Sequence, residues 1–309
     1  MILISAAVLF CQLSAALTSP MSSSATDDSL RARIERRVAE VPGATAGVAF
    51  RDLARSDTLY IGADERFHAA STMKVPVMIE LFRRVDRGQI SLSQPITLKN
   101  EFASIVDGTP YSLDAKDDSD SLVYSWIGSP VSVHDLLEHM ITRSSNLATN
   151  TLIGLVGATR ANATAHELGA KDIQVLRGVE DNKAYAAGMN NTTTARDLAV
   201  LMAAIETGKA ASPASTDSMR AILSRQEFND EIPAGLPAGT RVAHKTGQIT
   251  GHLHDAAIVY PRGRGPYVLV VLTRDIPDEK VARSLIADIS RLVFEHATQG
   301  TSAAARNAR

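Results

Sequence analysis

The tetrapeptide Ser71-Thr72-Met73-Lys74 opens the first strongly amphipathic segment of the chain. Helical spacing places Lys74 one turn after Ser71, so an amine would lie beside a hydroxyl near the positive end of a helix dipole. A serine hydroxyl becomes a good nucleophile when a neighbouring base takes its proton, and a lysine can act as that base only if its pKa is lowered. Pro76 predicts an irregular first turn, because proline has no amide hydrogen to donate. Taken alone, the pattern is also consistent with a simple helix cap.

Two further short motifs follow along the chain. Residues 142–146 read Thr-Arg-Ser-Ser-Asn and precede an apolar helical run, while residues 244–247 read His-Lys-Thr-Gly and end a predicted strand. The first could be an ordinary helix cap and the second a solvated edge lysine. A glycine at position 247 would let another group approach the strand closely. The order of the three motifs, on a helix start, a helical region and a strand, favours one shared catalytic site.

The hydrophobic patterns predict strands near both ends of the chain and helices between them. Alternating residues predict strands, and the middle of the chain has mostly helical spacing. The fold class is therefore α/β, with an antiparallel sheet flanked by helices and an all-helical lobe. The predicted units are a discontinuous α/β lobe, residues 26–70 and 225–298, and a helical lobe, residues 71–224.

Composition excludes several kinds of partner and cofactor. The chain has 309 residues, with 32 Lys and Arg against 34 Asp and Glu, so no basic surface predicts a nucleic-acid or anionic-membrane partner. The single cysteine, Cys11, cannot form an internal disulfide, and no Cys/His spacing of the zinc type occurs. His252 and His254 alternate onto one face of a strand but lack a third ligand, so we predict no metal and no cofactor. A small-molecule partner and a monomer are expected.

The first residues have the composition of an export signal. Residues 2–17 are almost wholly apolar and Ser14-Ala15-Ala16 offers small residues for cleavage, although a basic n-region is absent. We predict a signal peptide over residues 1–25, a periplasmic or secreted protein, and no stable membrane span, because the apolar run is short. Residues 299–309, rich in Ala and Ser, predict a disordered tail.

The three motifs together resemble the penicillin-recognising serine enzymes, and more closely the class A β-lactamases, whose motifs are Ser-x-x-Lys, Ser-Asp-Asn and Lys-Thr-Gly. The similarity extends from about Val41 to His296 and includes Asn191-Thr-Thr-Thr and the segment 255–261. The resemblance implies a two-lobed fold, an α/β lobe and a helical lobe, with the active-site cleft between them.

The resemblance also implies a role for each matching residue. Ser71 matches the acylated nucleophile and Lys74 its proton acceptor or electrostatic partner. Ser144 matches the hydroxyl that relays a proton to the departing lactam nitrogen, and Asn146 the amide that binds the carbonyl of the substrate side chain.

The strand motif would bind the other end of the substrate. Lys245 and Thr246 match the pair that holds the substrate carboxylate, beside Gly247. The backbone amides of Ser71 and Gln248 would form the oxyanion hole, where fixed donors stabilise the tetrahedral intermediate.

The segment that should carry the deacylating base departs from the family pattern. The family has Glu-x-x-x-Asn, whereas residues 177–185 read Arg-Gly-Val-Glu-Asp-Asn-Lys-Ala-Tyr, with one residue between the glutamate and the asparagine. We predict Glu180 as the base. The alternatives are Asp181, no side chain at all, or a Glu180 that only pairs with Arg177 or Lys183.

Three other positions depart from the family. Asn191 stands where the family usually has an aspartate, which removes a salt bridge that could brace this loop. Ser145 replaces the aspartate of the second motif, which predicts altered packing. Leu253 stands where many members have an arginine; Arg274 could supply that charge or be a solvated surface residue.

The predicted function is a serine hydrolase that opens β-lactam rings through an acyl-enzyme on Ser71, with Glu180 activating the water that releases it. The substrate would be a β-lactam or a related acyl compound. A D,D-peptidase or esterase of the same superfamily, or a sensor that stays acylated by penicillin, would share the first half of this reaction.

Overall fold

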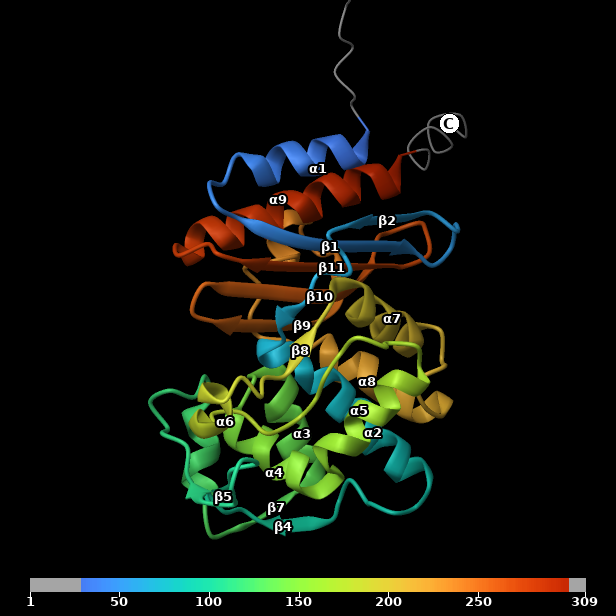
Figure 1. Ribbon diagram of the computed structural model, residues 1–309. Coiled ribbons are helices and arrows are strands. Elements are labelled where there is room, and N and C mark those ends of the chain that lie inside the picture. Colours follow the sequence, from blue (N-terminus) through green and yellow to red (C-terminus); the bar gives the residue numbers. More distant parts are fainter. Residues whose placement is uncertain (1–28, 300–309) are drawn as a thin grey trace, which may run out of the picture.

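The computed structural model describes residues 29–299, which form two lobes stacked on each other (Figure 1). The predicted signal peptide, residues 1–25, and all but the first residue of the predicted tail, residues 299–309, lie outside this range. Among the residues described, no helix is long and apolar enough to cross a membrane.

One lobe is built on a five-stranded antiparallel sheet in the order β2-β1-β11-β10-β9. These strands are β1 (Thr45–Asp52), β2 (Thr58–Ile61), β9 (Arg241–Ile249), β10 (His252–Tyr260) and β11 (Tyr267–Arg274). Strand β1 pairs with β11, so the two ends of the chain meet in the middle of the sheet. Alternate side chains of β11 enter different cores, with Val270 toward the helical lobe and Val271 toward the outer helices.

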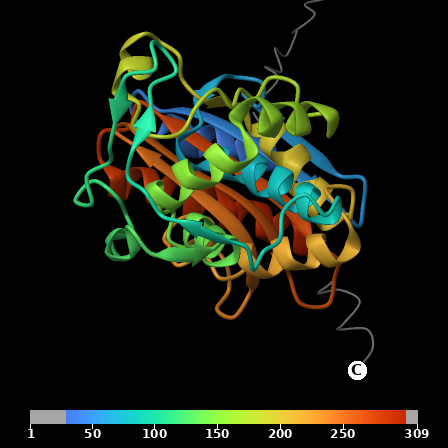
Figure 2. The same ribbon diagram turned by 90° about the horizontal axis from the view of Figure 1, so that it is seen from below.

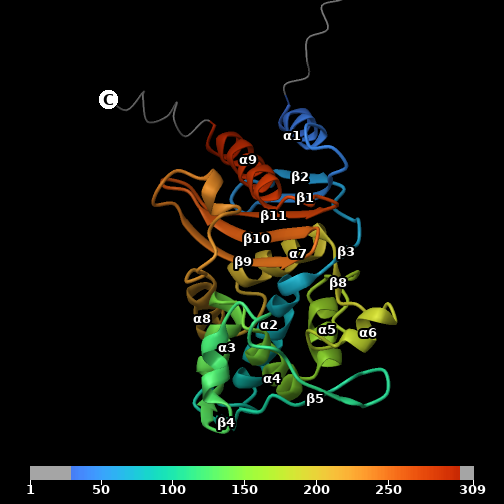
Figure 3. The ribbon, with the colours of Figure 1, turned by 90° about the vertical axis from the view of Figure 1, so that its left-hand side faces the viewer.

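Two helices cover the outer face of the sheet, α1 (Leu30–Ala39) and α9 (Glu279–Thr298) (Figure 3). They pack against each other, and Arg33 and Arg37 of α1 form ion pairs with Glu295 and Asp288 of α9.

The other lobe surrounds a central helix, α2 (Lys74–Asp86), which packs against four other α-helices of this lobe (Figure 2). Every residue from Lys74 to Phe82 is buried. The other helices are α3 (Val133–Thr142), α4 (Asn146–Val156), α5 (Ala158–Glu167), α6 (Asn182–Ala186), α7 (Ala195–Glu206) and α8 (Pro213–Leu223). Helix α7 packs on the inner face of the sheet and joins the two lobes.

Short elements complete the chain, and they refine the prediction. The α/β class with an antiparallel sheet is confirmed, but the helical lobe also holds two short ladders, each with a proline that limits pairing. The ladders are β4 (Pro95–Thr97) with β7 (Pro130–Ser132) and β5 (Phe102–Ala103) with β6 (Pro110–Tyr111); β3 (Phe67–His68) pairs with β8 (Thr192–Thr193) between the lobes. The 3-10 turns are η1 (Ala70–Met73), η2 (Ser121–Trp126) and η3 (Pro233–Gly235).

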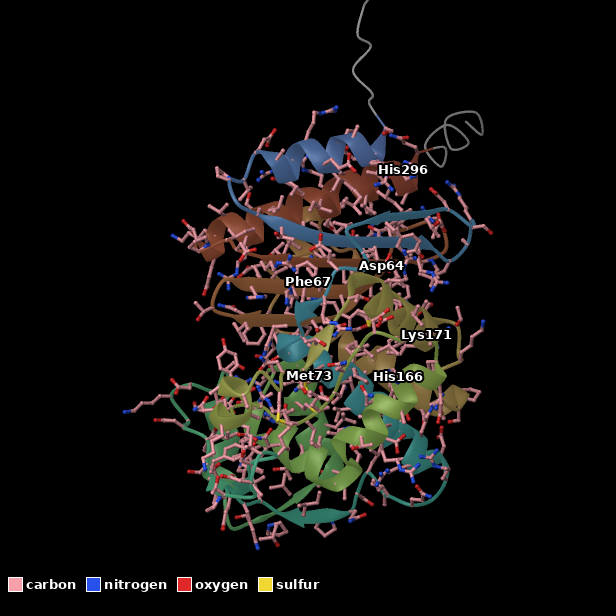
Figure 4. The ribbon with its side chains drawn as sticks, in the orientation of Figure 1. Asp64, Phe67, Met73, His166, Lys171 and His296 are labelled. Atoms are coloured by element: carbon pink, nitrogen blue, oxygen red, sulfur yellow. The ribbon has the colours of Figure 1, made fainter. Side chains whose placement is uncertain are left out.

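The chain crosses from the sheet to the helical lobe between Phe67 and Met73, both buried (Figure 4). Ser71 lies in the 3-10 turn η1, and α2 begins only at Lys74. Pro76 therefore falls in the first turn of α2. The N–H groups of a first turn have no partner within the helix, so a proline there costs the helix no hydrogen bond. This irregular start places Ser71 at the boundary between the lobes.

Candidate active site

Two adjoining cavities lie between the lobes, and Ser71, Asn146 and Gln248 line both of them. The larger, about 610 Å³, also contacts the loop before α4 and the end of β9; the smaller, about 460 Å³, contacts the segment before α6. The structure thus brings together the predicted site residues that line one or both cavities, Ser71, Ser144, Asn146, Glu180, Thr246, Gly247 and Gln248.

Strand β9 presses directly on the turn that carries Ser71. A Cβ atom added at Gly247 would lie 3.1 Å from the backbone nitrogen of Ser71 and 3.1 Å from that of Thr72. Because such contacts are tighter than ordinary packing, only glycine leaves the strand and the turn in their present positions.

Lys74 is fully buried beneath this turn. Its Nζ donates to the Ser144 carbonyl oxygen at 2.6 Å, to Ser144 Oγ at 3.1 Å and to Asn146 Oδ1 at 3.0 Å. Burial lowers the pKa of Lys74 to about 7, although Asp118 and Glu180 act in the opposite direction. At neutral pH this amine can therefore both accept and return a proton.

Ser144 stands between two buried lysines. Its Oγ also accepts from Lys245 Nζ at 3.0 Å, and Lys245 Nζ donates in addition to the Thr246 carbonyl oxygen at 2.9 Å. Burial, reinforced by the charge of Lys74, holds the pKa of Lys245 well below its ordinary value. Since both lone pairs of the Ser144 hydroxyl accept from amines, its own hydrogen is available to a third group.

Glu180 contacts the site through Asn146. Its Oε1 accepts from Asn146 Nδ2 at 2.6 Å, and the residue lines the smaller cavity together with Ser71. Desolvation raises the pKa of the Glu180 carboxyl above its ordinary value. The amide of Asn146 thus connects Lys74 on one side with Glu180 on the other.

The cations near Glu180 in sequence are engaged elsewhere. Arg177 donates to the Met189 carbonyl oxygen at 2.9 Å and to Asn190 Oδ1 at 3.0 Å. Lys183 forms an ion pair with Asp107 at 3.0 Å. The alternative in which Glu180 pairs with Arg177 or Lys183 therefore has no support in the hydrogen bonds of this loop.

The neighbouring acid, Asp181, has a structural position. Its carboxylate accepts from Ser104 Oγ and the Ile105 amide, both at 2.9 Å, and it caps α6 through the Ala184 amide at 3.1 Å. These bonds attach the loop to the β5–β6 hairpin. Of the two adjacent acids, only Glu180 is positioned toward Asn146.

Two buried asparagines hold the loop in place. Asn150 on α4 accepts from the Val179 amide at 2.6 Å and donates to the Val179 carbonyl oxygen at 3.0 Å. A Cβ atom at Gly178 would collide with the Asn150 side chain, so a larger residue there would displace the amide that makes these two bonds. Asn191 accepts from the Leu176 amide and donates to the Arg177 carbonyl oxygen. A neutral amide therefore braces the loop where the family would use an aspartate.

Asp118 was not identified from the sequence. It is buried, and its carboxylate accepts from the Asn146 amide at 2.9 Å and the Leu147 amide at 3.0 Å, at the first turn of α4. Ser145 caps the same helix through the Ala148 amide. A carboxylate is stabilised at a helix N-terminus, so Asp118 supplies from a distant loop the charge that Ser145 lacks.

A second residue that was not predicted from the sequence is Arg283, which lines the same cavity as Leu253. Arg283 lines the larger cavity and donates to Gln248 Oε1 at 3.2 Å, between the carboxylates of Glu231 and Glu279. Arg274 instead pairs with Glu65 at 2.9 Å and is not among the residues that line either cavity. The hypothesis that Arg274 supplies the charge to the cleft is therefore not supported.

Within residues 29–299, no group of three or more His, Cys, Asp or Glu side chains is arranged to hold a metal ion. The chemistry that this arrangement offers is acid–base and nucleophilic: a serine at a lobe boundary, two lysines with lowered pKa, and a carboxylate with raised pKa.

Comparison with known proteins identifies the family. A sequence profile described as "Beta-lactamase enzyme family" matches residues 29–297. The chain belongs to this family. Beta-lactamase AST-1 of Nocardia asteroides is 28% identical over 305 residues, which cover 95% of this chain and 94% of that protein.

Solved structures agree with the assignment. PBP-A superposes with a TM-score of 0.75 at 32% identity, covering 86% of this chain and 95% of that one. The ancestral class A β-lactamase GNCA superposes with a TM-score of 0.76 at 28% identity, covering 87% and 100%. The chain is therefore a serine hydrolase of the β-lactamase family.

We expect Asp118→Asn to destabilise the protein, because one remaining acceptor oxygen would face two N–H groups of α4. The free energy of unfolding should fall by about 2 kcal/mol, the range for hydrogen bonds to charged groups. The control is Asp117→Asn, which makes the same charge change at an exposed neighbour. It should change the free energy of unfolding by no more than about 0.5 kcal/mol. Urea unfolding measures both, and equal losses would contradict the role of Asp118.

Proposed function

We propose that the protein hydrolyses β-lactams by the two-step route of class A enzymes. In the first step Ser71 Oγ attacks the lactam carbonyl, an ester forms, and the lactam C–N bond breaks. In the second step water attacks the ester carbonyl and releases Ser71. The observation that carries the proposal is that Glu180 lines the same cavity as Ser71, since a hydrolase needs a base for this water.

The first step requires a proton acceptor and a proton donor. The Ser71 proton would pass to the neutral amine of Lys74, whose pKa of about 7 supports this role. Ser144 would give its hydroxyl proton to the departing nitrogen and regain one from Lys74 or Lys245, both of which donate to its Oγ. The protons then balance without a cofactor.

The edge of the sheet would bind the substrate. Strand β9 is an edge strand, so part of its backbone has no ladder partner. The amides of Ser71 and Gln248 would stabilise the oxyanion, and Lys245 with Thr246 would hold the carboxylate, as expected from the family. Losing one oxyanion donor typically costs about a hundredfold or more in rate.

The second step would depend on Glu180. As a carboxylate it would take a proton from water while the oxygen attacks the ester, and Asn146 holds it in position. A desolvated carboxylate is a stronger base than one in water, which suits this role.

Replacing Glu180 with Gln should slow release of the acyl group more than its formation. The amide keeps the shape and the bond to Asn146 but is a far weaker base, so deacylation should fall by about a hundredfold or more. Intact-mass spectrometry with a penicillin should then show an accumulating adduct. Glu101→Gln, the same change at an exposed glutamate that lines neither cavity, should leave the ratio of acylation to deacylation unchanged.

The same measurement separates the alternatives. A wild-type protein that keeps its adduct would be a penicillin-binding protein or sensor, which the similarity to PBP-A makes the second candidate. Ser71→Ala should give no adduct at all. Wild-type turnover by Ser71→Ala, or unchanged release by Glu180→Gln, would contradict the assignment.

Acylation should depend on pH through Lys74. Below pH 7 the ammonium form predominates and cannot accept the Ser71 proton, so the acylation rate should fall about tenfold per pH unit. Single-turnover acylation from pH 5 to 9 tests this in Glu180→Gln, which removes the titration of Glu180 from the profile. The fall should begin at a lower pH in this variant than in the wild type, because the charge of Glu180 raises the pKa of Lys74. A rate independent of pH would exclude Lys74 as the base.

We also propose export, on the composition of residues 1–25. N-terminal sequencing of the protein recovered from an expressing bacterium would test it, with cleavage near residue 25 expected and an intact Met1 contradicting it.

A further inference from the structure

Two histidines surround the turn that leads into Ser71. His68, at the end of β3, accepts a hydrogen bond at its Nδ1 from the Ala70 amide at 3.0 Å. The carbonyl oxygen of His68 accepts from His254 Nε2 at 2.9 Å. His254 is on β10, so the sheet is linked to the residues immediately before the nucleophile.

The turn adopts a conformation that an alanine avoids. Ala70 has a φ of 44°, in the left-handed region, where the Cβ atom of an L-residue crowds the backbone. Its flanks are fixed by the Ala69 amide, which donates to the Asn191 carbonyl oxygen at 2.8 Å, and by the Thr72 amide, which donates to the Ala69 carbonyl oxygen at 3.0 Å. The bond from Ala70 to His68 completes this set and compensates for part of the strain.

The bond from the Ala70 amide to His68 has the pattern of an Asx-turn. In that turn a side chain accepts from the backbone N–H two residues later, usually through the Oδ1 of Asn or Asp. Here the ring nitrogen of His68 takes the place of that oxygen. A side chain without an acceptor at this position would leave the Ala70 amide to find another partner.

The hydrogen bonds determine the tautomer of both rings. The Thr273 amide donates to His254 Nδ1 at 3.3 Å, so the His254 proton is on Nε2, where it donates to the His68 carbonyl oxygen. His68 accepts at Nδ1, so its proton is also on Nε2. Burial lowers the pKa of each ring to about 4, which keeps both neutral.

We propose that His68, supported by His254, is a positioning residue for Ser71: its Nδ1 fixes the left-handed turn at Ala70 and thereby orients the hydroxyl and amide of Ser71. The inference rests on the proposed role of Ser71 as the nucleophile. His68 and Ser71 line the same cavity, so the acceptor lies within the site rather than in a remote core. A misplacement of about 1 Å at a reacting group can cost a hundredfold in rate.

The test compares two amide variants. In His68→Asn the Oδ1 atom takes the place of Nδ1 and can accept from Ala70, whereas in His68→Gln the amide lies one methylene farther out. Single-turnover acylation by a chromogenic cephalosporin should fall by about tenfold to a hundredfold in His68→Gln and stay within about threefold of the wild type in His68→Asn. Equal losses in the two variants would overturn the proposal.

A second measurement uses the wild-type protein and does not depend on the folding of a variant. Long-range ¹H–¹⁵N NMR of the histidine rings should show His68 protonated at Nε2 and unprotonated at Nδ1 near neutral pH. The opposite tautomer would overturn the proposal, because Nδ1 could not then accept from Ala70. If this tautomer is found and the wild type is not acylated at all, it is the proposed function that fails, not the geometry of the turn.

Discussion

The candidate active site is centred on one hydroxyl that accepts hydrogen bonds from two buried lysines of different lobes. Ser144 Oγ lies 3.1 Å from Lys74 Nζ of the helical lobe and 3.0 Å from Lys245 Nζ of the sheet. Removing two amines from water costs several kcal/mol unless their donors find acceptors. The observed arrangement of the lobes gives both amines an acceptor in the same hydroxyl, and it places the candidate site residues around that hydroxyl.

Chain topology makes this closure possible. The sheet is assembled from both ends of the chain, and the helical lobe is inserted between β2 and β9. The chain leaves the sheet after Ile61, reaches the lobe boundary at Ser71, and re-enters the sheet at Arg241, shortly before Lys245. The close approach at Gly247 then brings strand and turn into contact. Ser71, the proposed nucleophile, and β9, the proposed substrate-binding strand, thus come from opposite ends of the insertion.

Sequence patterns predicted the parts of the site that are local, and missed those that depend on distant loops. The three motifs, the irregular turn at Pro76 and the antiparallel sheet could be inferred because spacing and alternation determine them. Asp118 could not, because its contacts with α4 bridge a separation along the chain that no pattern encodes. Glu180 and Asp181 are adjacent acids, and their different partners, Asn146 for Glu180 and the Ser104 hydroxyl for Asp181, follow from the folded loop and not from the sequence pattern. Asn191 illustrates a third case, in which the expected loss of a brace was compensated by amide hydrogen bonds.

The distribution of backbone strain supports the view that this boundary is the functional part of the molecule. Among residues 29–299, four residues other than glycine have a positive φ, namely Ala70, Ser144, Glu180 and Asp275. Three of them are at the candidate site. Ala70 precedes the proposed nucleophile, Ser144 carries the hydroxyl that bridges the two lysines, and Glu180 is the proposed base. Each such conformation costs about 1 to 3 kcal/mol and persists only where surrounding contacts enforce it. Here those contacts are hydrogen bonds: His68 bonds to Ala70, the two lysines to Ser144, and Asn146 to Glu180. The groups that hold the strained residues therefore belong to the candidate site itself.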